Sequence, residues 1–154
     1  MLRQRAIYFA MLHKIREALR QRDDSYKLKS QLELDGATFG RRESGTEQEV
    51  LIAVETKEWI NASGKRKARA GFAKVIGGKK EIVNAWLPGV HKLSSNSKAW
   101  VIGTHHGGNS DYLESYLAEY FYRFNRRHDP KRLFHRAVRA CVLAQPRTYG
   151  TLFG

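Results

Sequence analysis

The chain has 154 residues, enough for one compact domain and too few for two ordinary ones. Hydrophobic residues make up 42% and charged residues 28% of it, a composition that excludes a disordered chain. Its 28 Lys and Arg against 15 Asp and Glu give a formal net charge of +13, which favours a nucleic acid partner and leaves DNA and RNA both open. The longest apolar run, residues 50–54, is too short for a membrane span, so we expect a cytoplasmic protein with no membrane partner.

The first expected element is a basic amphipathic helix in residues 1–24. Its apolar positions recur at helical spacing, and the basic residues lie largely around the other side. The apolar positions are Tyr8, Met11, Leu12, Ile15 and Leu19. We expect residues 25–154 to form a core, with strands within 26–76 and helices within 88–143.

Three segments have the patterns of β-strands: residues 26–35, 50–55 and 67–76. In the first, apolar and polar residues alternate, so Leu32 and Leu34 should face the core and Asp35 should lie on the polar face. A polar connection over 41–49 and a turn over 61–65 separate the segments. Three strands in succession make an antiparallel meander the simplest topology.

Three C-terminal helices are expected after residues 82–86, which are either a short helix or irregular. The first covers 90–102 and should end at Gly103, and the second covers 113–124 with apolar residues at helical spacing. The third begins after Asp129 and Pro130. It should bury Leu133, Phe134, Ala137, Val138 and Cys141. The order helix, strands, helices indicates an α+β fold with a small sheet.

Asp35 is the first candidate for a metal ligand, because a carboxylate at a strand end can hold Mg²⁺. Glu55 follows the next strand and could join it, although either residue could equally occupy an ordinary turn or strand end. His91, His105 and His106 also suggest a metal site, but adjacent histidines rarely share one ion. We favour a structural role for them, with phosphate contact as the alternative.

Several longer motifs point to one family. Residues 87–107 read LPGVHKLSSNSKAWVIGTHHG, and residues 112–127 read YLESYLAEYFYRFNRR. With AMLHKIREAL at 10–19, LDGATFGR at 34–41 and LIAVE at 51–55, they resemble the ISXO-like insertion-sequence transposases. The likeness covers most of the chain.

This resemblance implies a ribonuclease H-like fold and a DDE-type active site that uses Mg²⁺, in which asparagine can stand in the third position. It implies that Asp35 is the first catalytic and metal-binding carboxylate. Asn96 and Lys98 would match the asparagine and lysine of the closing motif. The implied partner is double-stranded DNA at insertion-sequence ends, and a homo-oligomer would be compatible with it.

The basic residues near the C-terminus are the expected DNA contacts. Residues 121–154 contain a single acidic residue, Asp129, among these basic residues. An ordinary solvated helix carries both positive and negative side chains. The candidates are Arg123, Arg126, Arg127, Lys131, Arg132 and Arg136.

Two departures from the family pattern bear on catalysis. Gly36 stands where the family has glutamate after its first aspartate. The family also has a strand with a Thr-Asp-Gly segment that carries the second aspartate, yet no aspartate occurs between Ile76 and Leu87. An internally truncated transposase would show this pattern. We therefore expect impaired strand cleavage and leave open whether the chain is an enzyme or a non-catalytic DNA-binding or transposase-regulating protein.

Overall fold

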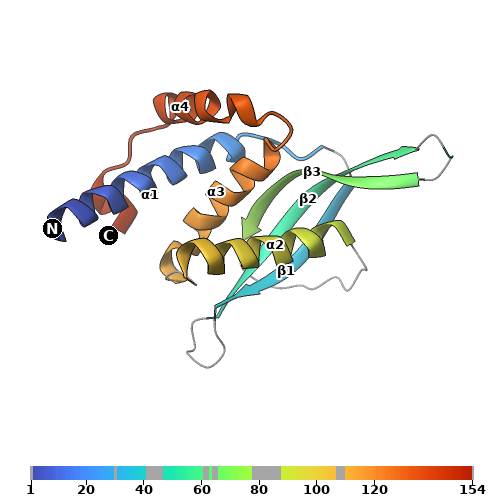
Figure 1. Ribbon diagram of the computed structural model, residues 1–154, viewed down its shortest axis with the longest axis horizontal. Coiled ribbons are helices and arrows are strands. Elements are labelled where there is room, and N and C mark those ends of the chain that lie inside the picture. Colours follow the sequence, from blue (N-terminus) through green and yellow to red (C-terminus); the bar gives the residue numbers. More distant parts are fainter. Residues whose placement is uncertain are drawn as a thin grey trace.

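The computed structural model describes residues 2–29, 31–40, 47–60, 63, 66–77, 88–106 and 110–153. The chain begins with a long helix, continues through a sheet and ends in further helices, so the α+β class is confirmed (Figure 1). The expected features at 41–46, at 82–86 and over most of 61–65 lie outside the described residues. Among the described helices, none has the length and hydropathy to cross a membrane.

The sheet follows the N-terminal helix α1 (Leu2–Asp24). Its strands are β1 (Gln31–Phe39), β2 (Gln48–Ile60) and β3 (Arg66–Gly77), antiparallel and in the order β1-β2-β3. The first strand therefore begins five residues later than expected, and residues 26–29 form an irregular connection from α1.

The C-terminal part of the chain consists of α2 (Pro88–His105), α3 (Leu113–Asn125), α4 (Leu133–Leu143) and the short α5 (Tyr149–Phe153). Single 3₁₀ turns, η2 (Ser110–Tyr112) and η3 (Pro130–Arg132), precede α3 and α4. Gly103 does not end α2, contrary to expectation. The helix runs through it, and His106 makes the left-handed turn with φ of 52°.

The helices lie in layers over one face of the sheet. Helices α2 and α3 pack on the strands, α1 packs on α3, and α4 packs on α1 at the outside (Figure 1). The main core lies between the sheet and the first helical layer. Its buried residues are Ala37, Phe39, Val50, Ile52, Val54, Ala73, Leu93, Val101, Leu113, Tyr116, Leu117 and Phe121.

The expected orientation of the first strand is wrong. Because Asp35 pairs with Ile52 and Ala37 with Val50, both of which lie in the core, Asp35 faces the helices and not the solvent. Leu32 is 43% exposed on the other face. The strand continues to Phe39. Burial of Ala37 and Phe39 on one face outweighs burial of Leu32 and Leu34 on the other, and this sets the orientation of the strand.

The expected buried face of α4 is confirmed only for Leu133 and Ala137. Ala140 is buried and Leu133 and Ala137 pack beside it, whereas Phe134 is 73% exposed and Cys141 is exposed. The helix packs on α1 through the cluster that contains Leu19 and Ala140. Val138 is 45% exposed and lies outside this cluster.

The sheet, α3 and α1 are joined where α1 and α3 end. Arg126 Nη2 donates to Asp23 Oδ1 at 2.6 Å, and Asn125 Nδ2 donates to Asp23 Oδ2 at 2.9 Å. The Asn125 side chain also accepts from the backbone N of Ala73 at 2.8 Å and donates to its carbonyl oxygen at 2.9 Å. Among the described strands β3 lies at the edge of the sheet, and Asn125 makes the pair of backbone hydrogen bonds with Ala73 that a neighbouring strand would make.

Candidate functional site

Asp35 lies at the contact between β1 and α2. Its side chain is 18% exposed, and its Oδ2 atom accepts a hydrogen bond from Ser94 Oγ at 3.0 Å. His91 Nδ1 lies 3.2 Å from the same oxygen, and the His91 side chain is 59% exposed. One carboxylate oxygen therefore has an imidazole and a hydroxyl beside it, in a position that solvent reaches from the side of His91.

Helix α2 determines which residues meet this carboxylate. His91 and Ser94 are three residues apart and so occupy the same side of the helix. Asn96 is about 200° around the helix from Ser94 and is exposed, so it does not lie with Asp35. Lys98 returns to the side of β1, with Nζ 5.9 Å from the centre of the Phe39 ring. Of the three expected catalytic residues, Asp35 and Lys98 thus border the same contact and Asn96 does not.

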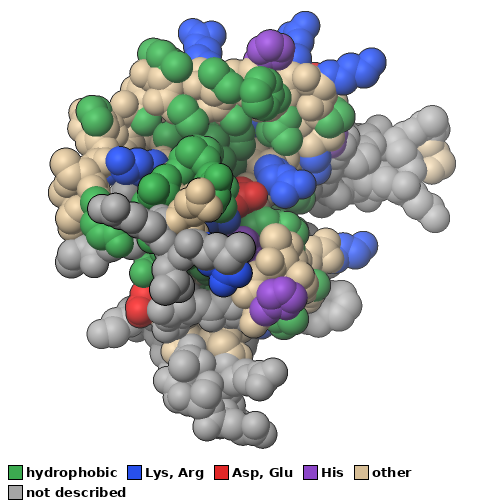
Figure 2. Space-filling model, turned by 60° about the vertical axis from the view of Figure 1, so that its left-hand side comes forward, with side chains coloured by type: hydrophobic (Ala, Val, Ile, Leu, Met, Phe, Trp, Pro, Cys, Tyr) green, Lys and Arg blue, Asp and Glu red, His purple; other side chains and the backbone are tan. Residues whose placement is uncertain are grey.

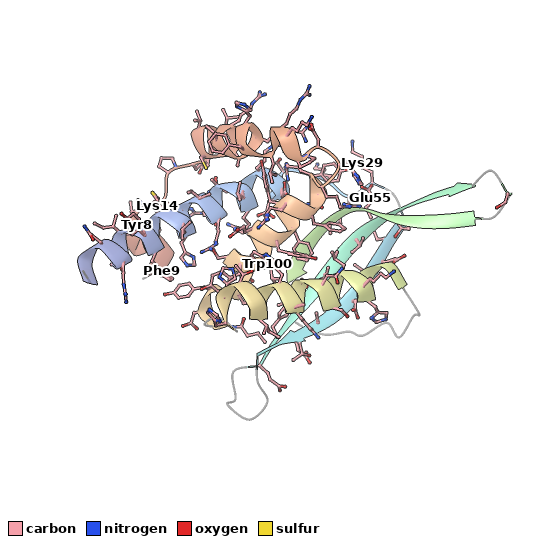
Figure 3. The ribbon with its side chains drawn as sticks, in the orientation of Figure 1. Tyr8, Phe9, Lys14, Lys29, Glu55 and Trp100 are labelled. Atoms are coloured by element: carbon pink, nitrogen blue, oxygen red, sulfur yellow. The ribbon has the colours of Figure 1, made fainter. Side chains whose placement is uncertain are left out.

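Glu55 lies on the opposite face of the sheet. It is paired with Leu32, three residues along β1 from Asp35, so the two carboxylates alternate to opposite sides. Glu55 is 2% exposed and accepts hydrogen bonds from Tyr26 Oη at 3.0 Å and from the backbone N of Lys29 at 3.2 Å (Figure 3). These hydrogen bonds hold the connection after α1 against the sheet. Because Glu55 and Asp35 lie on opposite faces, they do not form a metal site together.

Mg²⁺ is the metal that the family resemblance implies for Asp35. That ion prefers an octahedral set of oxygen ligands and usually binds through carboxylates, phosphates and water. Asp35 offers a carboxylate, but the described groups next to it are an imidazole and a hydroxyl. Among the described residues, no group of three or more His, Cys, Asp or Glu could hold a metal ion.

The C-terminal basic residues fall into two sets. Lys131, Arg132, Arg136 and Arg139 are exposed along η3 and α4, and we call them the α4 basic surface. At the top of the view in Figure 2, where α4 lies, Lys and Arg side chains project beside hydrophobic ones. Asp129 partly offsets this charge, because Arg136 Nη2 donates to its Oδ2 at 3.0 Å.

The arginines that end α3 have mainly structural contacts. The Arg126 side chain is only 11% exposed, is paired with Asp23 and lies 3.5 Å from the centre of the Tyr122 ring. Arg127 donates to the carbonyl oxygen of Phe124 at 2.8 Å and lies over its ring. Arg123 is 56% exposed, so of these three it is the one most open to a phosphate.

His105 is the last residue of α2, and His106 follows it. His105 stacks on Tyr116 with ring centres 3.9 Å apart, and Trp100 meets it edge-on at 4.9 Å. Figure 3 labels Trp100 on α2 beside α3. Burial and the nearby Arg16 lower the pKa of His105, which favours the neutral ring. The structural interpretation of this histidine is supported.

Comparison with protein-family models, curated proteins and solved structures finds no match for the chain. The likeness to insertion-sequence transposases therefore rests on the motifs themselves.

The sequence did not predict that His91 and Ser94 contact the carboxylate of Asp35. Both residues stand in the motif at 87–107, but their spacing has meaning only once α2 is known to pack on β1. The alternation of Asp35, Ala37 and Phe39 was the available signal, because it places the carboxylate on the core face.

Proposed function

We propose that the chain is a DNA-binding protein of the insertion-sequence transposase type whose strand-cleavage activity is impaired. The proposal includes the ribonuclease H-like assignment, double-stranded DNA as partner and a cytoplasmic location. The observation that carries it is the α4 basic surface, since α4 is the outermost helix and its exposed cations can reach a phosphate backbone.

The impairment of cleavage is supported by the surroundings of Asp35. Two-metal phosphodiester chemistry needs carboxylates around both ions, about 3.5–4 Å apart. Glu55 is directed to the far face of the sheet, and the residues beside Asp35 are His91 and Ser94. The described contacts of Asp35 therefore do not include a second carboxylate that could flank the two ions.

The test is binding of a fluorescent DNA duplex, measured by anisotropy. The double variant Arg132→Gln/Arg139→Gln removes two charges from the α4 basic surface and should weaken binding roughly tenfold at 50 mM salt. The matched control Arg5→Gln/Lys14→Gln removes the same charge from exposed positions of α1 and should change affinity about twofold.

Equal losses in the two variants would mean that net charge alone attracts DNA, and the α4 basic surface would have no special role. Cleavage is assayed separately on insertion-sequence ends with Mg²⁺ or Mn²⁺. Robust cleavage that disappears in Asp35→Ala would overturn the proposed impairment.

A further inference from the structure

We propose that the outer side of α4 is a self-association surface, through which two copies of the chain pair their α4 helices antiparallel about a twofold axis. The contact is the apolar stripe of α4, which we define as Phe134, Val138, Cys141 and Val142. Phe134 is 73% exposed, Val142 is 76% exposed, Val138 is 45% exposed and Cys141 is exposed. Helix α4 packs on α1 and lies at the outside, so the described part of the chain leaves this stripe uncovered (Figure 1).

Helix α4 has three sides with different chemistry. The residues of one side, Leu133, Ala137 and Ala140, belong to the cluster that packs on α1. At about 100° per residue, the apolar stripe and the α4 basic surface occupy the other two sides, and the three sides point roughly 120° apart. The side that is apolar and the side that is cationic therefore face in different directions.

This arrangement determines which occupant fits the apolar stripe. A flat anionic membrane or a single acidic helix would have to contact the stripe and the cations together, but the two sides point apart. A second copy of the chain needs the apolar stripe alone. In an antiparallel pair centred on Val138, this residue meets Val138 of the second copy, and Phe134 meets Val142 of the second copy.

Charge complementarity favours the antiparallel direction. Lys131 is exposed just before α4, and in this register it lies level with the C-terminal end of α4 in the second copy, where carbonyl oxygens carry partial negative charge. The twofold axis leaves both α4 basic surfaces on one side of the pair and both bodies on the other, so the arginines stay out of the contact. One DNA duplex could then contact both surfaces, a consequence that rests on the proposed function, whereas the dimer itself does not.

The size of the contact predicts a weak dimer. A stable interface buries about 800 Å² on each partner, more than four side chains supply, so we expect a dissociation constant of about 10–100 µM. Each copy has a formal net charge of +13, so two copies repel each other at low ionic strength. Self-association should therefore tighten between about 50 and 500 mM salt, whereas DNA binding weakens over the same range.

The experiment is sedimentation equilibrium of the full-length chain under reducing conditions and without DNA. Val138→Arg places two like charges face to face at the twofold axis and should weaken self-association at least about tenfold. The matched control Ile102→Arg adds the same charge at an apolar side chain of α2 that is 65% exposed, and should change self-association by less than about twofold. Urea denaturation checks that both variants fold. A chain that stays monomeric up to about ten times the expected dissociation constant, or an equal loss in the two variants, would overturn the proposal.

Disulfide trapping tests the register of the pair. Val138→Cys, made together with Cys141→Ser, brings two sulfur atoms together at the axis and should cross-link under mild oxidation. In the unaltered chain Cys141 lies about 9 Å along the helix from its counterpart, beyond the roughly 7 Å between Cα atoms that a disulfide spans, so it should cross-link far more slowly. Ile102→Cys with Cys141→Ser is the control at an equally accessible position.

The remaining outcomes separate this proposal from its alternatives. Cross-linking as fast through Cys141 or through Ile102→Cys as through Val138→Cys would contradict the antiparallel pair. A monomeric chain that binds anionic phospholipid vesicles, and loses this binding in Val138→Arg, would assign the apolar stripe to a membrane and reject the dimer. Loss of DNA binding in Arg132→Gln/Arg139→Gln should leave the dimer intact, so failure of the proposed function and failure of the dimer are distinguishable.

Discussion

The buried ion pair between Arg126 and Asp23 joins α3 to α1 and leads to the first prediction. Both side chains are nearly covered, at 11% and 9% exposure. Arg126→Ala should lower the free energy of unfolding by about 3 kcal/mol, because Asp23 would remain buried without its principal counter-charge. Urea denaturation measures this loss.

Two further variants check the explanation. Arg126→Lys should recover part of the loss, since it restores the charge and lacks the two-pronged geometry of the guanidinium. Arg123→Ala, at a side chain 56% exposed, should change stability by no more than about 0.5 kcal/mol. If Arg126→Ala were as mild as Arg123→Ala, the ion pair would contribute little.

His13 predicts a pH dependence of stability. It is 4% exposed, lies 4.4 Å from Phe9 between ring centres, and burial, Arg16 and His105 lower its pKa from 6.5 to about 4. Between these values the unfolded chain binds a proton that the folded chain does not, so stability falls as the pH drops from 6.5 toward 4. The full difference corresponds to about 3 kcal/mol.

The variant His13→Phe keeps a ring in the cluster and removes the titrating group. Its free energy of unfolding should fall less steeply between pH 6.5 and pH 4 than that of the unaltered protein, when both are measured by urea denaturation. Parallel curves would show that carboxylates, and not His13, cause the acid sensitivity.

At the scale of elements, the orientation of α4 can be tested directly. Phe134 is 73% exposed although its spacing placed it in the core, whereas Leu117 of α3 is fully buried. Phe134→Ala should cost less than about 0.5 kcal/mol, and Leu117→Ala about 2–5 kcal/mol, in urea denaturation. A large loss for Phe134→Ala would restore the orientation expected from the sequence.

The types of most elements could be predicted because each has a clear period. The apolar spacing of α3 and the run at 50–54 identify a helix and a strand without tertiary information. Which face is buried was harder. Leu32 and Leu34 outweighed Asp35 in the pattern, but the contact with α2 favours the face that carries Ala37 and Phe39.

The candidate site could be predicted only in part for the same reason. Asp35 stands out as a carboxylate in a strand, yet its neighbours His91 and Ser94 come from a helix more than fifty residues later. Similarly, Asn125 lies in the motif at 112–127, but its hydrogen bonds to Ala73 of β3 follow only from where α3 ends. Such contacts depend on packing that no local pattern contains.

At the scale of the whole molecule, the charge of +13 predicts a salt-dependent affinity for DNA. If the four Lys and Arg of the α4 basic surface contact phosphates, the logarithm of the binding constant should fall with the logarithm of salt with a slope of about −3 to −4. Removing Arg132 and Arg139 should make this slope shallower by about 2. Anisotropy titrations at several salt concentrations measure both, and Asp35→Ala, remote from α4, should leave the slope unchanged. The same titrations with a duplex RNA of equal length separate the two nucleic acids, because tighter binding of RNA at matched salt would contradict a DNA-binding function.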